Sequence, residues 1–203
     1  MGFPPIGIMS LSSVIKQAGH ECVMFDQANP DTPNQVIIDR INQEQPALVG
    51  LSFLSTTSYP YAKMLAREIR ATNQHVKLAF GGVFASLNAS LVKLQCPEVD
   101  FVCRGDGEQL LLDLLANLEN PQDVASLTWM KNGQVIQNPN RAMERQLDQW
   151  PFPDRESLKL DYVESMPLDV PVVLSMRRFT TMQTSRGCPW PCIFCDIPIF
   201  NEG

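Results

Sequence analysis

The sequence predicts an α/β protein built on a doubly wound parallel sheet. Short apolar runs alternate with segments whose apolar residues recur at helical spacing, which is the pattern of strands joined by crossover helices. Glycine or other turn-forming residues separate most of these segments. A hydrophobic fraction of 44% and a charged fraction of 19% are typical of a globular protein, so the 203 residues can bury a core.

The first part of the chain contains two predicted helices, each followed by a predicted strand. Apolar residues at helical spacing occupy Met1–Ala18, and Gly19 is a natural helix end. We predict a short buried strand over His20–Asp26. A second helical pattern over Val36–Ile41 precedes the next predicted strand, Ala47–Leu54.

The middle of the chain continues this alternation. In chain order, the predicted elements are a helix over Tyr59–Ala71, a strand over Val76–Phe80, a helix over Leu87–Leu94, a strand over Asp100–Cys103 and a helix over Leu110–Leu118. The Val76–Phe80 strand ends at Gly81-Gly82.

The pattern changes after Pro121. We predict a hairpin over Ser126–Ile136, because Asn132-Gly133 is a strong turn signal. A proline-rich connector follows around residues 138–154. We then predict strands over Pro171–Ser175 and Phe179–Thr184.

Three loops at predicted strand ends form the first candidate site. Ligands of doubly wound sheets bind beyond the carboxyl ends of the strands. The three loops, which hold small or hydroxyl-bearing residues, are Ser52–Thr56, Gly81-Gly82 and Gly105–Glu108. Each also has an ordinary structural explanation, since Gly-Gly ends many strands, Ser and Thr cap helices, and an acidic residue suits the first turn of a helix.

Three cysteines near the end of the sequence form the second candidate site. Cys188, Cys192 and Cys195 are spaced as C-x3-C-x2-C, and cysteine thiolates are the ligands of [4Fe–4S] clusters. Three protein ligands would leave the fourth iron open to a small molecule. The alternatives are zinc, which in structural sites takes four ligands, and a disulfide, which would leave one thiol over.

Composition narrows the class of protein. The net charge is −6 and basic residues do not cluster beyond Arg177-Arg178, which argues against nucleic-acid binding. Apolar runs are shorter than the roughly 20 residues of a membrane helix, and we expect neither a membrane span nor a signal peptide. Six cysteines and an oxygen-sensitive cluster loop favour a reducing cytoplasm.

The cysteine loop resembles that of the radical S-adenosylmethionine (SAM) superfamily, with Arg186-Gly187 before it and Phe194 before its last cysteine. The resemblance implies that Cys188, Cys192 and Cys195 hold a [4Fe–4S] cluster, and that SAM chelates the open iron. Phe194 would lie beside the adenine of SAM. The protein would orient these groups and exclude water, while the cofactor supplies the radical chemistry.

The strand-end loops resemble those of cobalamin-binding domains with a flavodoxin-like fold. The Ser-x-Leu pattern of Ser52 and Leu54, with Thr56 after it, implies contacts to the lower axial base of cobalamin or its nucleotide tail. Gly81 and Gly82 would leave space for the dimethylbenzimidazole tail. The cobalamin-binding residues implied are therefore Ser52, Leu54, Thr56, Gly81 and Gly82.

A third loop also resembles the cobalamin-dependent radical SAM class. Gly105, Gly107 and Glu108 match its Gly-Glu-Gly-Glu turn, although Asp106 replaces the first Glu. The Asp-x-His-x-x-Gly motif that supplies an axial histidine to cobalt is absent, and neither His20 nor His75 takes its place. We expect the family's first strand, which precedes its Pro-Pro-x-Gly segment, to be missing from this chain.

Together these features predict the domain organisation and the function. We expect a cobalamin-binding domain over residues 1–120, a hairpin and linker over 121–160, and the beginning of a radical SAM domain over 161–203, with its first barrel strand and cluster loop. The resemblance implies the amino-terminal part of an enzyme that cleaves SAM reductively, for methyl transfer or another radical transformation. Its partners would be a small-molecule substrate and an electron donor such as flavodoxin or ferredoxin. The alternative is a non-catalytic corrinoid-binding module or inactive fragment, and we assign no catalytic residue.

Overall fold

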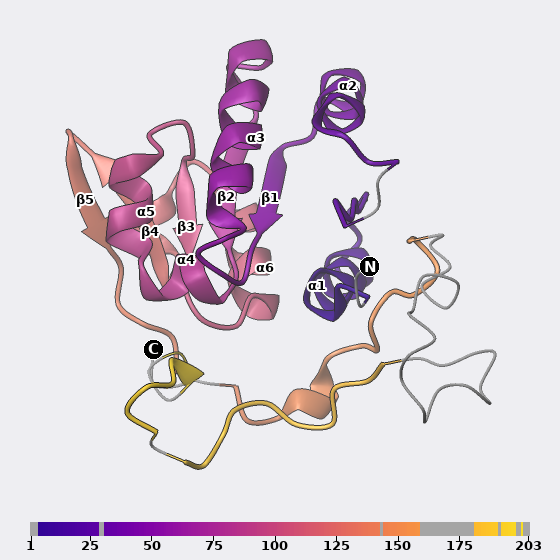
Figure 1. The fold of residues 1–203 in the computed structure, drawn as a ribbon, viewed down its shortest axis with the longest axis vertical. Helices are drawn as coiled ribbons and strands as arrows, with labels where there is room; N and C mark the ends of the chain where they lie inside the picture. The colour runs from indigo at the N-terminus through magenta and orange to yellow at the C-terminus, as the bar shows by residue number, and fades with distance from the viewer. Residues whose placement is uncertain are drawn as a thin grey trace. The chain divides into compact units, whose positions relative to one another are not determined.

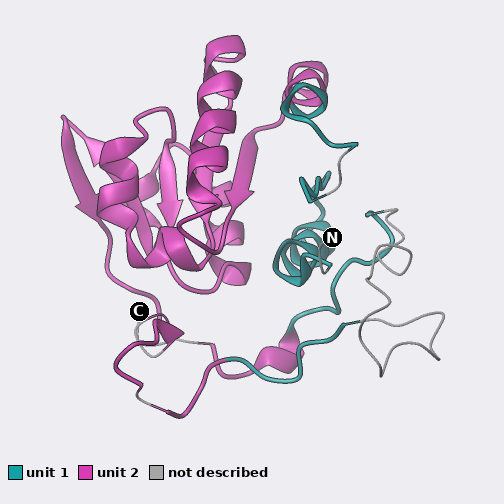
Figure 2. Ribbon diagram, viewed as in Figure 1, with its two compact units in different colours: residues 1–37, 150–186 teal, residues 38–149, 187–203 magenta. Residues whose placement is uncertain are grey.

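The structure is a computed structural model of the chain and describes residues 4–28, 31–142, 144–158, 181–190, 192–197 and 200. The chain divides into two compact units (Figure 2). Unit 1 consists of Met1–Ile37 and Trp150–Arg186, and unit 2 consists of Ile38–Gln149 and Gly187–Gly203. The three candidate strand-end loops therefore belong to unit 2.

A five-stranded sheet forms the centre of unit 2 (Figure 1). Its strands lie in the order β1-β2-β3-β4-β5; the first three are parallel, and β4 and β5 join antiparallel. Their bounds are Leu48–Ser52 (β1), Lys77–Gly81 (β2), Phe101–Cys103 (β3), Leu127–Lys131 (β4) and Gln134–Gln137 (β5). The predicted α/β fold with a mainly parallel sheet is confirmed, and the predicted hairpin extends this sheet through β4.

Helices cover both faces of the sheet in unit 2. Their bounds are Tyr59–Thr72 (α3), Val83–Leu87 (α4), Ala89–Gln95 (α5) and Glu108–Ala116 (α6), with short 3-10 turns at Pro121–Asp123 (η1) and Leu147–Gln149 (η2). Helix α6 lies on one face, and α3, α4 and α5 lie on the other (Figure 1). This two-sided cover explains why the middle of β2 is apolar, with Leu78, Ala79 and Phe80 all buried.

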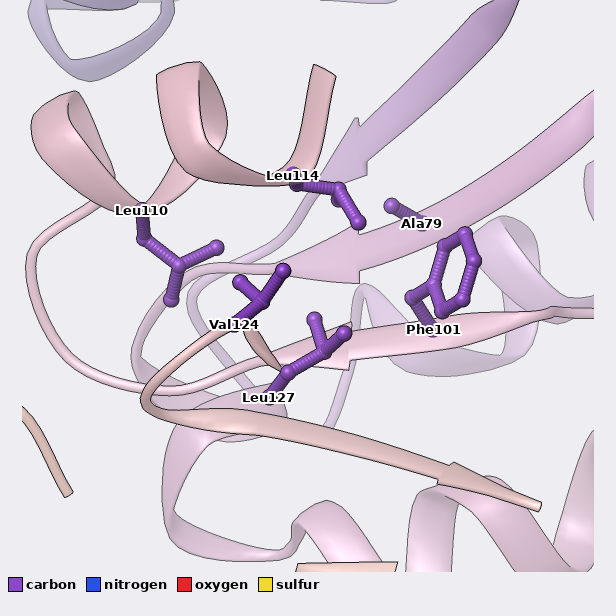
Figure 3. Close-up of a cluster of buried hydrophobic side chains, with 6 residues drawn as sticks. All are labelled: Ala79, Phe101, Leu110, Leu114, Val124 and Leu127. Carbon is purple, nitrogen blue, oxygen red and sulfur yellow. The ribbon is translucent and has the colours of Figure 1, made fainter. Parts of the chain in front are cut away.

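Different side chains of β2 and β3 fill the core on each face. On the α6 face, the buried cluster consists of Ala79, Phe101, Leu110, Leu114, Val124 and Leu127 (Figure 3). On the opposite face, the ring of Phe80 meets Phe53 edge-on at a centroid distance of 5.0 Å and Tyr59 at 6.5 Å. Because Ala79 and Phe80 are adjacent in a strand, they point to opposite faces and join the two layers.

Arg70 and Asp100 tie the amino ends of β2 and β3 to α3. The Asp100 carboxylate accepts the amide N–H of Leu78 at 2.8 Å and a guanidinium N–H of Arg70 at 2.7 Å. Arg70 also donates to the backbone carbonyls of Glu98 and Val76. The end of the sheet away from the candidate loops is therefore held by charge-assisted hydrogen bonds.

Unit 1 is organised around helix α1 (Ile6–Gln17), which contacts the proline-rich connector. The Asp154 carboxylate accepts hydrogen bonds from Ser12 at 2.8 Å, Lys16 at 2.7 Å and Ser157 at 2.7 Å. The Asp154 amide donates to the carbonyl of Met9 at 3.0 Å. The connector is thus fastened to α1 by both backbone and side chain. Helix α2 (Asn34–Glu44) runs from unit 1 into unit 2.

Three predicted elements differ from the structure. Residues 20–26 form no strand, because they have no backbone ladder, and the His20 amide instead bonds the carbonyl of Ile15 at 3.1 Å. The predicted helix over Leu87–Leu94 is two helices, because Asn88 adopts a non-helical backbone at φ −120° and ψ 27°.

The third difference concerns the predicted strand over Phe179–Thr184. Its described part, residues 181–184, is irregular, because a strand requires a hydrogen-bonded neighbour and none is present among the described residues. Phe179 and Thr180 lie outside the described residues, as does the whole predicted strand over Pro171–Ser175.

We expect Asp154→Asn to loosen the connector from α1. Burial alone would raise the pKa of Asp154, but hydrogen bonds from Lys16, Ser157 and Ser12 lower it below the ordinary value of 3.8. The carboxylate therefore stabilises this contact at neutral pH, and the stabilisation is lost as the pH falls below about 4. We expect the substitution to weaken the contact by about 1–2 kcal/mol at pH 7, since it removes the charge that Lys16 meets.

Hydrogen exchange of the amide at position 154 measures this opening. Asp148→Asn is the matched control, because it removes the same charge from the exposed η2 turn. Equal protection in the Asp154→Asn and Asp148→Asn chains at pH 7 would contradict the assignment.

Candidate functional site

The carboxyl ends of β1, β2 and β3 meet at one edge of the sheet. Because the three strands are parallel, the loops that follow them leave the sheet at the same edge. Ser52, the last residue of β1, lies in register with Gly81, the last residue of β2. The amide of Phe53 continues this pairing by donating to the carbonyl of Gly81 at 3.1 Å. The first two candidate loops are therefore neighbours.

A strip without bulky side chains runs along the ends of β1 and β2. Gly50 is in register with Ala79, and Ser52 with Gly81, so these four residues point to the face that α6 covers. A side chain at Gly50 or Gly81 would begin in open space, with no heavy atom of the described structure within 4 Å beyond its chain neighbours. Ser52 follows Gly50 by two residues, lies opposite Gly81 and is exposed. We call Gly50, Ser52 and Gly81 the open strip.

Gly82 has a different role from Gly81. Its φ is +92°, a left-handed conformation that side-chain-bearing residues rarely adopt. A Cβ atom at Gly82 would overlap the carbonyl oxygen of Phe53 and lie 3.0 Å from the amide nitrogen of Phe53. We expected both glycines to leave room for a ligand. At Gly82 the room is filled by the backbone of Phe53, so the structure itself requires glycine there.

Ser86 joins the second and third candidate loops. Its hydroxyl donates to the carbonyl of Gly82 at 2.9 Å and also lies 3.4 Å from the carbonyl of Cys103. The same oxygen accepts the amide N–H of Gly105 at 3.1 Å. One half-buried hydroxyl therefore links the end of β2 to the end of β3. The three loops predicted from the sequence converge on one edge.

The loop after β3 positions the start of α6. Gly105 has φ +77°, so it needs the conformational freedom of glycine, whereas Gly107 has φ −93° and does not. Glu108 begins α6 and is only 4% exposed. An acidic side chain in the first turn interacts favourably with the helix dipole. These residues have clear structural roles, and a ligand contact at Gly107 or Glu108 stays a prediction.

The loop after β1 presents its two remaining candidates to solvent. Leu54 is 72% exposed and Thr56 is also exposed. The hydroxyl of Ser55 lies 2.8 Å from that of Thr57 and 3.0 Å from that of Ser58, which fixes the turn that leads into α3. Leu54 and Thr56 are thus displayed on an ordered turn at the same edge as the open strip.

The cysteine loop is accessible in the structure. Cys188 and Cys192 are exposed, Cys195 is half-buried, and the amide of Cys195 donates to the carbonyl of Cys192 at 3.1 Å. Phe194 is 88% exposed. Among the described residues, no three or more His, Cys, Asp or Glu side chains are placed to hold a metal ion. Three accessible thiols at this spacing suit an iron–sulfur cluster chemically, and their assembly into one site stays a prediction.

Two other cysteines are poorly suited to bind metal. Burial raises the pKa of the Cys96 thiol to about 12, with a further contribution from its hydrogen bond to Glu98. Burial alone raises the pKa of the Cys103 thiol to about 12. Because thiolate is the form that ligates metals, the raised pKa values disfavour metal binding at these two cysteines. The accessible thiols of the cysteine loop are therefore the better candidates for metal ligands.

Sequence reasoning missed Gly50 and Ser86. Gly50 interrupts the apolar run of β1, and a glycine inside a strand often marks a place where another group approaches the backbone closely. Ser86 follows Gly82 by four residues, the spacing at which a hydroxyl bonds back to a helical carbonyl. Its second link, to Gly105, depends on tertiary structure and leaves no local signal.

No helix among the described residues is both long enough and apolar enough to cross a membrane.

Two known proteins are similar in sequence to this chain over most of its length. The chain is 29% identical over 196 residues to an uncharacterized methyltransferase of Pyrococcus horikoshii, covering 95% of this chain and 40% of the relative. It is 26% identical over 200 residues to the anaerobic magnesium-protoporphyrin IX monomethyl ester cyclase of Synechocystis, covering 95% of this chain and 38% of the relative. The chain thus spans two fifths or less of the length of these relatives.

A solved structure shares the fold. The cobalamin-dependent S-adenosylmethionine radical enzyme OxsB matches 90% of this chain and 24% of its own chain, with a TM-score of 0.66 and 20% identity. The resemblance indicated by the cysteine loop and the strand-end loops is confirmed by these similarities. The B12 binding domain profile matches residues 2–115, which include β1, β2, β3 and all three converging loops. Since this match covers more than half of the sequence, the chain belongs to the B12-binding domain family.

Proposed function

We propose that this chain is the cobalamin-binding, amino-terminal part of a cobalamin-dependent radical SAM enzyme. The observation that carries the proposal is the open strip at the carboxyl ends of β1 and β2, inside the segment that matches the B12 binding domain. The relatives and the solved structure support it, because they include a methyltransferase, a cyclase and a cobalamin-dependent radical enzyme. As the chain covers only part of these proteins, the activity of the whole protein belongs to the proposal.

The open strip suits the flat heterocycle at the end of the cobalamin tail. A planar ring can lie against a sheet only where side chains do not stand in its way, and Gly50 and Gly81 leave that surface bare. Ser52, opposite Gly81, offers a hydroxyl that can donate to a ring nitrogen or a sugar oxygen. Bound cobalamin would supply methyl transfer or assistance to a radical step, and these residues would hold and orient it.

The cysteine loop supports the second half of the proposal. Cys188, Cys192 and Cys195 would ligate three irons, and Phe194 would border SAM on the open iron. A bound cluster would supply the electron that cleaves SAM. Exposure of the loop thiols favours their loading with iron, since thiols become ligands only when accessible and deprotonated. The small-molecule substrate and the flavodoxin or ferredoxin electron donor are part of the same proposal.

The alternative function is a corrinoid-binding module without catalysis. It is supported by one observation, namely that the match to the B12 binding domain covers residues 2–115 and does not include the cysteine loop. The two functions share the open strip and differ only at the cysteine loop, so separate tests of the two sites distinguish them.

We expect Gly81→Leu to weaken hydroxocobalamin binding by about tenfold or more while the protein stays folded, because the new side chain would fill the open strip. Absorbance titration measures binding and circular dichroism measures folding. Ala71→Leu is the matched control, since it adds a similar side chain at an exposed position near the end of α3. Unchanged affinity in a folded Gly81→Leu chain would rule out the strip as the tail site.

Gly82→Ala should act through stability instead. Its left-handed φ and the overlap with Phe53 predict a loss of about 2 kcal/mol or more in the free energy of unfolding. Urea unfolding measures this loss, with Gly81→Ala as the matched control because its added methyl group meets open space. Similar stabilities of the Gly82→Ala and Gly81→Ala chains would show that the close approach to Phe53 is unimportant.

We expect Cys188→Ser to abolish the [4Fe–4S] signal obtained after anaerobic reconstitution with iron and sulfide, because only two thiolates would remain on the loop. Electron paramagnetic resonance of the reduced sample measures the signal. Cys22→Ser is the matched control, since Cys22 lies outside the loop. A normal signal from Cys188→Ser would refute the ligand assignment. A parent chain that binds hydroxocobalamin but never assembles a cluster would favour the non-catalytic module.

A further inference from the structure

A polar cavity that is largely open to solvent lies on the side of the sheet opposite the open strip. It has a volume of about 380 Å³ and is bordered by the turn between α4 and α5, by Arg104 after β3 and by Gln137 at the end of β5. The polar residues of its wall are Ser86, Asn88, Ser90, Arg104 and Gln137, and none of the residues that line it is acidic. Helices α4 and α5 cover this face, whereas α6 covers the face of the open strip (Figure 1). The cavity therefore opens on the other face of the sheet from the open strip, although Ser86 in its wall also contacts Gly82 and Gly105.

Arg104 brings a positive charge that has no carboxylate partner in the described structure. One guanidinium nitrogen, Nη2, donates to the backbone carbonyl of Asn138, and the buried Nε has no hydrogen-bond partner. By contrast, Arg67 pairs with Glu98 at 3.1 Å and Arg70 pairs with Asp100 at 2.7 Å. Burial lowers the pKa of Arg104, which reflects the unfavourable desolvation of its charge. A half-buried cation without a counter-charge is stabilised by any anion that reaches it.

Neutral hydrogen-bond donors line the same cavity as Arg104. The Gln137 side-chain amide donates to the Ser90 hydroxyl at 2.7 Å, so the hydroxyl hydrogen of Ser90 is directed to another acceptor. The Asn88 side-chain amide donates to the carbonyl of Phe84 at 3.0 Å and carries a second N–H. The wall of the cavity thus offers one guanidinium and several neutral donors, and it holds no carboxylate. These groups favour binding of an oxyanion, which accepts hydrogen bonds on several oxygens.

We propose that this cavity binds a phosphate group through Arg104, Ser90 and Asn88. A phosphate accepts hydrogen bonds on each of its free oxygens, and it can therefore satisfy all three side chains at once. The group is either free inorganic phosphate or the phosphate of a small phosphomonoester. The volume of about 380 Å³ leaves room for either. The site adds to the proposed function and does not depend on cobalamin or on a cluster.

Calorimetric titration of the 203-residue chain with inorganic phosphate tests the proposal, with sodium chloride of equal ionic strength as the reference. We expect saturable binding of phosphate. Arg104→Gln should weaken it by about tenfold or more, because a charge-assisted hydrogen bond is lost. Arg67→Gln is the matched control, since it removes the same charge from an exposed pair on α3 and should leave binding unchanged.

Ser90→Ala provides a second variant in case Arg104→Gln does not fold. The change removes only a hydroxyl, and we expect phosphate binding about fivefold weaker. Parallel titration with ribose 5-phosphate distinguishes the two sources: tighter binding assigns the site to a phosphomonoester, and equal or weaker binding assigns it to free phosphate. The proposal is overturned if the parent chain binds neither compound, or if folded Arg104→Gln and Ser90→Ala chains both bind as the parent does.

Discussion

The approach of the Gly82 backbone to Phe53 is the constraint on which the candidate site depends. Only a residue without a side chain fits there, and its left-handed φ turns the chain sharply from β2 into α4. The rings of Phe53, Tyr59 and Phe84 pack with centroid distances of 5.4–6.0 Å. The turn places Ser86 one helical turn later, where its hydroxyl reaches the end of β3. The backbone contact between Gly82 and Phe53 thus joins the first two loops, and the Ser86 hydroxyl joins the second loop to the third.

The fold could be predicted where a local pattern and its tertiary partner are both present in the chain. The predicted ranges are close to those observed for β1, β2, α3 and α6. In each of these elements, apolar residues pack between the sheet and its covering helices. Residues 20–26 have equally good strand composition, yet composition cannot supply a neighbouring strand. The break at Asn88 escaped prediction for a related reason, since Leu87 and Leu91 keep helical spacing across it. The antiparallel addition of β4 to β3 likewise depends on pairing between distant residues.

The candidate site likewise contains some residues that a sequence motif identifies and others that only the three-dimensional structure identifies. The motif drew attention to Ser52, Gly81 and Gly82, and the first two do lie side by side at the strand ends. It could not separate the two glycines, because the difference between open space at Gly81 and the Phe53 carbonyl at Gly82 exists only in three dimensions. Gly50 completes the strip although no motif includes it. Arg104 was visible in the sequence as a residue beside Gly105, but its missing carboxylate partner is a property of its surroundings.

The uneven burial of the cysteines gives the protein two chemically distinct sets of sulfur atoms. Cys96 and Cys103 are held as thiols by their buried surroundings, so oxidants and alkylating reagents attack them slowly. Cys188 and Cys192 are open to solvent, and exposure to air converts such thiols first to sulfenic acid and then to disulfides. Oxidative damage therefore begins at the loop and leaves the core intact. A sample can in this way lose its capacity for metal while its circular dichroism spectrum stays that of the native fold.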